Sequence, residues 1–163
     1  MNITRLFNLQ QELDERIKKE HGLENESLFE RKVLALLVEL GELANETRCF
    51  KYWSKKPSSD TKIILEEYVD GVHFILSLGI ELNVHEELTD IETSSSDQDI
   101  VSLFMEVYRL TLALKENPTK EWYVKLISAY FQLGQALSFS IIDMEEAYLK
   151  KNLINHERQN TGY

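Results

Sequence analysis

The sequence is poor in cysteine, proline and glycine, with one, two and six of them among 163 residues. A single cysteine excludes an internal disulfide, and few helix-breaking residues favour long helices over a turn-rich β fold. No apolar run approaches the length of a membrane span, and the start MNITRLFNLQ lacks the apolar segment of a signal peptide. We therefore expect a cytoplasmic protein with no membrane association.

Positive charge is also scarce, because 18 Lys and Arg stand against 28 Asp and Glu and leave a net charge of −10. Nucleic acids and anionic membranes are bound by clustered Lys and Arg, so we expect neither as a partner. A small phosphorylated ligand remains compatible with this charge if a cation bridges it. The 43% hydrophobic content is typical of a globular chain, and the length predicts one domain over residues 1–163.

Apolar residues recur at helical spacing along most of the chain, which predicts an all-α helical bundle. Ser27 followed by Glu30 predicts a capping box for the second helix, and Asn117 before Pro118 predicts the start of the last one. The acidic and then serine-rich segment 84–97 is interpreted as a linker or mobile loop. The expected helices are 3–20, 27–50, 60–83, 98–116 and 118–156.

Two pairs of carboxylates lie on the expected second and third helices. Glu39 and Glu42 share one helical face, as do Glu67 and Asp70; in an antiparallel hairpin all four would converge. Carboxylates are costly to desolvate unless they are protonated, paired or bound to a metal, and oxygen ligands without paired His or Cys favour Mg²⁺, with Mn²⁺ as a substitute. A solvated acidic face is the alternative interpretation. His73 is interpreted as a packed core residue.

Two further sets of polar residues also share helical faces. Lys151, Asn155 and Arg158 follow one another at i, i+4 and i+7, so they either complement a helix dipole or bind a ligand. Gln10 and Asp14 lie four residues apart in the first helix. Taken alone this pair predicts a solvated face, although an amide offers both a donor and an acceptor to a nucleobase.

The carboxylate spacing resembles that of a known enzyme group. ELGE at 39–42 and EYVD at 67–70 look like the ExxE…ExxD signature of the all-α nucleoside triphosphate pyrophosphatases, which include the MazG-like proteins and the dimeric dUTPases. Three more stretches resemble the dimeric dUTPase branch. They are LQQELD (9–14), FKYW (50–53) and KNLINHERQNTGY (151–163).

This resemblance implies an obligate homodimer that hydrolyses dUTP to dUMP and pyrophosphate, and dUDP to dUMP and phosphate. Its Mg²⁺ ions would be held by Glu39, Glu42, Glu67 and Asp70, around a metal-activated water that attacks the phosphate chain. Glu39 and Glu42 are the candidate catalytic bases. The partner it implies is a nucleotide, and no protein partner is indicated.

The resemblance also implies a set of substrate contacts. Lys151, Asn155 and Arg158 would close over the phosphates and the deoxyribose. Gln10 would read the uracil edge with Asp14 close by. Trp53 would pack against the base or the sugar.

Two other functions remain open at this point. One is a MazG-like pyrophosphatase that acts on another nucleoside triphosphate, in which case replacing Gln10 would not alter discrimination against cytosine. The other is a non-enzymatic helical regulatory or interaction protein that uses the surface of residues 98–150. Such a protein would gain no thermal stability from Mg²⁺ and nucleotide, whereas an enzyme would.

Overall fold

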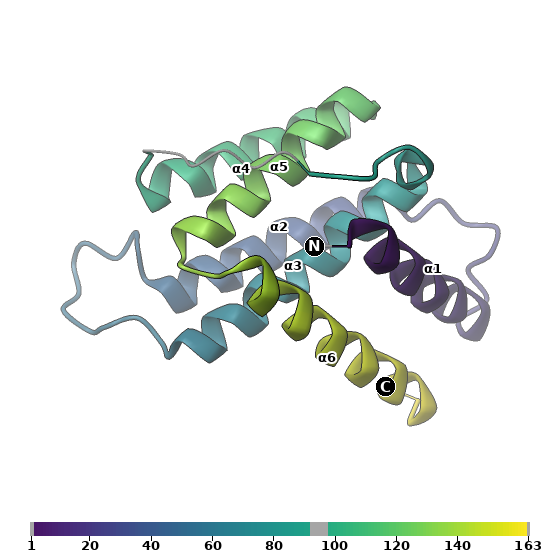
Figure 1. Cartoon of the computed structure of the whole chain (residues 1–163), viewed down its shortest axis with the longest axis horizontal. Coiled ribbons are helices and arrows are strands. Elements are labelled where there is room, and N and C mark those ends of the chain that lie inside the picture. The colour runs from purple at the N-terminus through teal and green to yellow at the C-terminus, as the bar shows by residue number, and fades with distance from the viewer. Residues whose placement is uncertain (1, 92–97, 163) are drawn as a thin grey trace.

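A computed structural model describes residues 2–91 and 98–162, and within them the chain is helical with no strand (Figure 1). The all-α helical bundle is therefore confirmed. No helix in these ranges combines the length and the apolar content that crossing a bilayer requires. The helices are α1 (Ile3–Glu20), α2 (Phe29–Thr47), α3 (Thr61–Glu81), the short 3₁₀ helix η1 (Val84–Glu86), α4 (Ile100–Glu116), α5 (Lys120–Ala136) and α6 (Ile141–Asn160).

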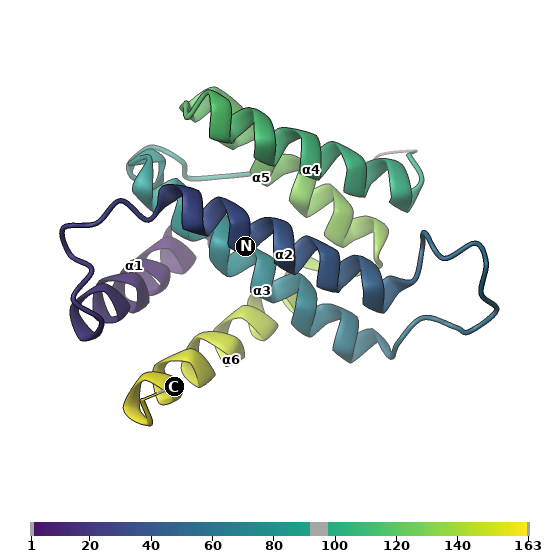
Figure 2. The same cartoon turned by 180° about the vertical axis from the view of Figure 1, so that it is seen from behind.

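Helices α2 and α3 form the antiparallel pair at the centre of the bundle (Figures 1 and 2). Helix α4 packs on α2 and against α5, while α1 and α6 pack against α3 and against each other. Helix α3 is therefore covered on more than one side, as its continuous apolar content predicts. Its buried side chains include Tyr68, Val72, Ile75 and Leu76.

A glycine allows α5 to approach α3 closely beside the acidic residues. A Cβ atom at Gly71 would overlap the ring of Tyr130. The hydroxyl of Tyr130 donates to the backbone carbonyl of Tyr68 at 2.7 Å, and the rings of these two tyrosines stack with centroids 4.8 Å apart. This contact fixes the turn of α3 that carries Asp70.

The boundaries of three helices agree with the sequence to within two residues. Helix α1 covers the predicted range 3–20, and the side chain of Asn2 caps it by accepting from the backbone N–H of Arg5 at 3.0 Å. Helix α3 starts and ends inside the predicted range 60–83. Helix α4 begins after Asp99, whose carboxylate accepts from the backbone N–H of Ser102 at 3.1 Å.

The single last helix predicted over 118–156 is wrong, because the chain turns between α5 and α6. Ser138 adopts a positive φ of 68°, which ends the helical path without a proline or glycine at that position. Ser140 then starts α6 with a capping box, in which its side chain and that of Asp143 each accept from the other residue's backbone N–H. The pattern Ser-x-x-Asp was the available signal for this break.

Two predicted helix starts are also wrong. Helix α2 begins at Phe29 behind Leu28, with no side-chain hydrogen bond at its N-cap, so Ser27 forms no capping box. Helix α5 is capped by Thr119, whose hydroxyl accepts from the backbone N–H of Trp122, whereas Asn117 ends α4. In both places the predicted cap, Ser27 or Asn117, lies one or two residues before the residue at the N-cap position.

The segment 84–97 lies only partly within the described residues, because 92–97 fall outside them. Its first residues form η1, in which Val84 is 3% exposed. Leu88 and Ile91 pack against the core. This part of the segment therefore contains one short 3₁₀ helix and side chains that pack on the core, and the linker or loop near 84–97 stays a prediction.

Candidate active site

Antiparallel packing of α2 and α3 brings three carboxylates together. Each of Glu39, Glu67 and Asp70 offers an oxygen atom, and these atoms lie within 4.8 Å of one another. We call these three residues the acidic cluster. Glu42 lies one turn further along α2, is exposed and is not a member of the cluster. Of the four carboxylates expected to converge, three therefore do so.

The acidic cluster is only partly compensated by positive charge. The pKa of Glu39 is raised from its ordinary value of 4.5 to about 7. Burial is the largest cause, and the negative charges of Asp70, Glu42 and Glu67 add smaller contributions. Burial and neighbouring carboxylates likewise raise the pKa of Glu67. At Asp70 burial outweighs the hydrogen bond from Lys151, so its pKa is also raised. A hard divalent cation would supply the missing charge, and the all-oxygen donor set suits it.

The polar face of α6 lies against this cluster. Lys151 Nζ is 2.7 Å from Asp70 Oδ2, and both side chains are about one-fifth exposed, at 19% and 21%. Arg158 Nη1 donates to Asn155 Oδ1 at 3.5 Å, and its charge acts to lower the pKa of Asp70. The structure therefore places the three predicted residues of this face at the cluster or at the pocket beside it.

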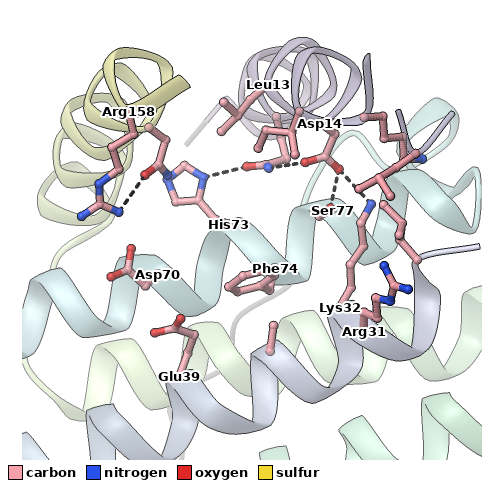
Figure 3. Close-up of a pocket in the computed structure, with 17 residues that line it drawn as sticks. Leu13, Asp14, Arg31, Lys32, Glu39, Asp70, His73, Phe74, Ser77 and Arg158 are labelled. Carbon is pink, nitrogen blue, oxygen red and sulfur yellow. Dashed lines mark hydrogen bonds and ion pairs between the residues drawn. The ribbon is translucent and has the colours of Figure 1, made fainter. Parts of the chain in front are cut away.

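A pocket of about 460 Å³ extends from the acidic cluster between α1, α2, α3 and α6 (Figure 3). Glu39 and Asp70 lie at one end, and Asp14 and Ser77 lie at the other. His73 and Phe74 lie between the two ends. The lining also includes Gln10, Leu13, Lys32, Asn155 and Arg158.

The far end of the pocket is built from paired charges. Lys32, only 9% exposed, places Nζ 3.0 Å from Asp14 Oδ2 and 2.6 Å from Glu81 Oε1. Lys18 reaches the same Glu81 oxygen at 2.8 Å, and the hydroxyl of Ser77 donates to Asp14. We call these five residues the lysine-paired network. Burial acts to raise the pKa of Glu81, but hydrogen bonds from the two lysines outweigh it and leave the pKa below its ordinary value.

Gln10 connects this network to the middle of the pocket. It is 3% exposed, and its Nε2 donates to Asp14 Oδ1 at 2.8 Å. Its Oε1 lies 2.7 Å from Nδ1 of His73 and accepts from the Tyr148 hydroxyl at 3.0 Å. The solvated face considered for Gln10 and Asp14 is therefore wrong, and the interpretation of His73 as a buried, packed residue is confirmed.

The sequence also carries a signal for Lys32, which belongs to none of the motifs described above. Lys32 precedes Leu36 by four residues and Leu43 by eleven, so it falls on the buried stripe of α2. A lysine at such a position needs a carboxylate partner. Glu39, seven residues after Lys32, lies on the same side of the helix, which is why both line one pocket.

Trp53 lies away from this pocket. It belongs to the connection between α2 and α3, is 64% exposed and makes edge contacts with Phe50 and Tyr52, with ring centroids 5.9 and 5.1 Å away. It does not line the pocket. Its predicted contact with the base or sugar stays a prediction.

Fold and site together define an all-α protein with an acidic site at one end of a pocket lined by polar and apolar side chains, an arrangement suited to a cation and a phosphorylated ligand. A family model described as dUTPase matches residues 2–163, essentially the whole chain. The protein therefore belongs to the dimeric, all-α dUTPase family and is a dUTP diphosphatase. A search of curated proteins returned no match.

Proposed function

We propose that this protein hydrolyses dUTP to dUMP and pyrophosphate with Mg²⁺ held by Glu39, Glu42, Glu67 and Asp70. The observation that carries the proposal is the convergence of Glu39, Glu67 and Asp70 from two helices, with an oxygen of each within 4.8 Å of the others. Glu42 lies on the next turn of α2 and adds its negative charge to this site. Mg²⁺ bound there would neutralise phosphate oxygens and activate a water for attack, and Mn²⁺ would substitute for it.

The chain's own residues orient the substrate in this proposal. Lys151 and Arg158 bring positive charge from α6 to the phosphate chain, and Asn155 lies between them on the same face. Glu39 or Glu42 accepts the proton of the attacking water. The same arrangement would accept dUDP, which has one phosphate fewer and would yield dUMP and phosphate.

We propose that the uracil lies at the far end of the pocket, with Gln10 as its reader. The amide nitrogen of Gln10 has two hydrogens and donates one to Asp14, so one N–H is left for a carbonyl of the base. Trp53 would contact the base or sugar from its loop. Replacing Gln10 by alanine should weaken discrimination between dUTP and dCTP, whereas an enzyme for another nucleotide would show no such loss.

We also propose that the protein is a homodimer and acts in the cytoplasm. Leu34 and Val38 on α2 are 63% and 49% exposed, and α4 packs on this helix with Met105 65% exposed and Leu112 49% exposed. Exposed apolar side chains on two helices that pack together favour association. The free thiol of Cys49 fits a reducing compartment.

The subunit arrangement is tested with Met105→Glu, which should lower the molar mass measured by light scattering toward that of one chain. Leu153→Glu on α6 is the matched control, because this residue is equally exposed at 65% and lies on neither α2 nor α4. Loss of the dimer in both variants, or in neither, would contradict the proposed association through α2 and α4.

The activity is tested by measuring pyrophosphate, phosphate and dUMP released from dUTP, dUDP, dCTP, dTTP and UTP. Each substrate is assayed with Mg²⁺, with Mn²⁺ and with excess EDTA. We expect metal-dependent turnover of dUTP that disappears in Glu39→Gln and persists in Glu30→Gln, which removes an exposed carboxylate on the same helix. Turnover in EDTA, or full activity of Glu39→Gln, would contradict the proposal.

A further inference from the structure

A nitrogen of His73 lacks a partner inside the pocket. Within residues 2–91 and 98–162, its Nε2 has no hydrogen-bond partner, although the atom is buried and the residue is only 5% exposed. Buried polar atoms are nearly always hydrogen-bonded in folded proteins. Such an atom in a pocket wall therefore points to a ligand group that is bound there in use.

The surrounding contacts determine which ring nitrogen of His73 carries the proton. Asp14 accepts hydrogen bonds from Lys32 and Ser77, and as a carboxylate it requires the NH₂ side of the Gln10 amide. The Gln10 oxygen must then face Nδ1 of His73 at 2.7 Å. An acceptor oxygen requires a proton on Nδ1, so Nε2 of a neutral His73 is an acceptor.

Burial keeps His73 in this neutral form. Desolvation first, and then the charge of Lys151, lower the pKa of His73 to about 3. The ring is held in place by stacking on Tyr148, with centroids 4.3 Å apart and planes inclined by 23°. The pocket thus presents a hydrogen-bond acceptor of fixed direction and no charge.

The position of His73 along α3 indicates which part of a nucleotide it meets. In α3, His73 and Ser77 follow Asp70 by three and seven residues. At a rise of 1.5 Å per residue, His73 lies about 4.5 Å and Ser77 about 10 Å beyond Asp70 along the helix axis. If Asp70 lies at the phosphates and Ser77 at the depth of the base, His73 lies at the depth of the sugar. The ring edge opposite Gln10 faces the side of Asp70 and Arg158 (Figure 3).

We propose that His73 Nε2 accepts a hydrogen bond from the 3′-hydroxyl of the bound deoxyribose. This inference rests on the proposed function, because it takes the phosphate end of the nucleotide to be at the acidic cluster. His73 is then a sugar-binding residue. Gln10 holds its ring through Nδ1 in addition to its proposed contact with the base, and Asp14 is a positioning residue that orients the Gln10 amide. A nucleotide without a 3′-hydroxyl leaves the buried acceptor without a partner, so the site selects against it.

Nitrogen-15 NMR of the imidazole groups tests this inference on the unaltered protein, which has only four histidines. We expect His73 to show a protonated Nδ1 and an unprotonated Nε2. With Mg²⁺ present, α,β-imido-dUTP should shift the Nε2 resonance in the direction of a hydrogen-bonded acceptor, and its 3′-deoxy counterpart should not. A proton on Nε2 in the free protein, or equal shifts with both nucleotides, would overturn the inference.

Steady-state kinetics give the second measurement, as the ratio of kcat/KM for dUTP to that for 2′,3′-dideoxyuridine triphosphate. We expect a ratio of about tenfold or more in the wild type, because the acceptor is buried. The ratio should fall toward one in His73→Phe. His85→Phe is the matched control, since His85 also carries a buried nitrogen without a partner among the described residues but does not line the pocket.

The outcomes separate the two proposals. Metal-dependent hydrolysis of dUTP with an unchanged ratio in His73→Phe would leave the proposed function standing and overturn the role of His73. No hydrolysis of dUTP by the wild type with Mg²⁺ or Mn²⁺ would overturn both. If His73→Phe does not fold, the NMR experiment decides the question without a substitution.

Discussion

The acidic cluster on α2 and α3 and the lysine-paired network on α1, α2 and α3 lie at opposite ends of one pocket, yet their carboxylates have opposite surroundings. At the cluster, burial and mutual repulsion raise the pKa of Glu39 and Glu67, and Lys151 offsets this only in part. In the network, two lysines hold the pKa of Glu81 below its ordinary value. Buried carboxylates with matched charges serve the fold, whereas carboxylates with an excess of negative charge are prepared for a ligand that brings the missing charge.

The largest effect on stability is expected from the network. Lys32→Met leaves Asp14 and Glu81 without their shared partner, at side-chain exposures of only 11% and 18%. Removing one partner of a buried ion pair costs about 3–5 kcal/mol. Urea unfolding, monitored by circular dichroism, would measure this loss in the free energy of unfolding.

Lys125→Met is the control for this measurement. Lys125 pairs with Glu121 at 2.7 Å, but the pair is exposed, at 49% and 74%. Its loss should change stability little, because solvent screens exposed ion pairs. Adding Asp14→Asn to Lys32→Met should recover part of the lost stability, since Asp14 has lost its lysine partner whereas Glu81 keeps Lys18. Equal destabilisation by Lys32→Met and Lys125→Met would contradict a structural role for the network.

The largest effect on activity is expected from the cluster. Asp70→Asn keeps the size of the side chain but removes one negative charge from the proposed metal site. Turnover of dUTP should fall by about 10²-fold or more, because charge stabilisation at the phosphates depends on the metal. The melting temperature of the metal-free protein should not fall by a comparable margin.

A parallel assay of activity and melting temperature on Asp70→Asn and Lys32→Met would show whether the two regions differ as described. The distinction between them breaks down if Asp70→Asn unfolds the protein while Lys32→Met leaves it stable.

A smaller and two-sided effect is expected from Lys151, the lysine that does pair with the cluster. Lys151→Met removes a positive charge 2.7 Å from Asp70 Oδ2, so Mn²⁺ alone should bind more tightly. The KM for dUTP should rise, because the same lysine is proposed to meet the phosphates. Calorimetric titration with Mn²⁺ at pH 8.5 and steady-state kinetics would measure the two effects. Weaker Mn²⁺ binding in the variant would contradict this expectation. It would indicate that Lys151 holds the cluster in place as a structural ion-pair partner, as Lys32 does in the network.

The smallest effect is a pH dependence of opposite sign in the two regions. The folded pKa of Glu39, about 7, exceeds its ordinary value of 4.5, so the metal-free protein should lose stability as the pH rises through this interval. The folded pKa of Glu81 is lowered, so its contribution is complete above about pH 4.5 and is lost as the pH falls. Melting temperatures measured between pH 3.5 and 8 would show both parts of this profile. We call them the acid limb, below about pH 4.5, and the neutral limb, between pH 4.5 and 7.

Single substitutions assign these limbs. Glu39→Gln should flatten the limb between pH 4.5 and 7, and saturating Mg²⁺ should reverse it in the wild type. Glu81→Gln should flatten only the acid limb. A neutral limb that is unchanged in Glu39→Gln would show that another group causes it.

Much of the fold was readable from the sequence because apolar spacing follows the helical repeat. The range of α1 was predicted in full and those of α3 and α4 nearly so. The turn between α5 and α6 was not predicted, because the residue with a positive φ is Ser138, neither a glycine nor a proline. Side-chain capping at Ser140 decided that break, and capping signals are weaker than periodicity.

By itself, the sequence determined the helix pair and the register of its acidic residues. Both helices have the same rise per residue, so the spacing of Glu39 and Asp70 along the chain is enough to place them level once the hairpin forms. It also determined the family, through motifs spread along the whole chain.

Only the tertiary structure decided which polar groups are compensated. Lys32 meets Glu81 across 49 residues, and His73 meets Gln10 across 63. Such contacts depend on how α1 and α6 pack onto α3 and on which side-chain rotamers fit the remaining space. Helical periodicity gives the face on which a residue lies, but the partner across an interface is set by packing, and that partner determines whether a buried charge stabilises the fold or awaits a ligand.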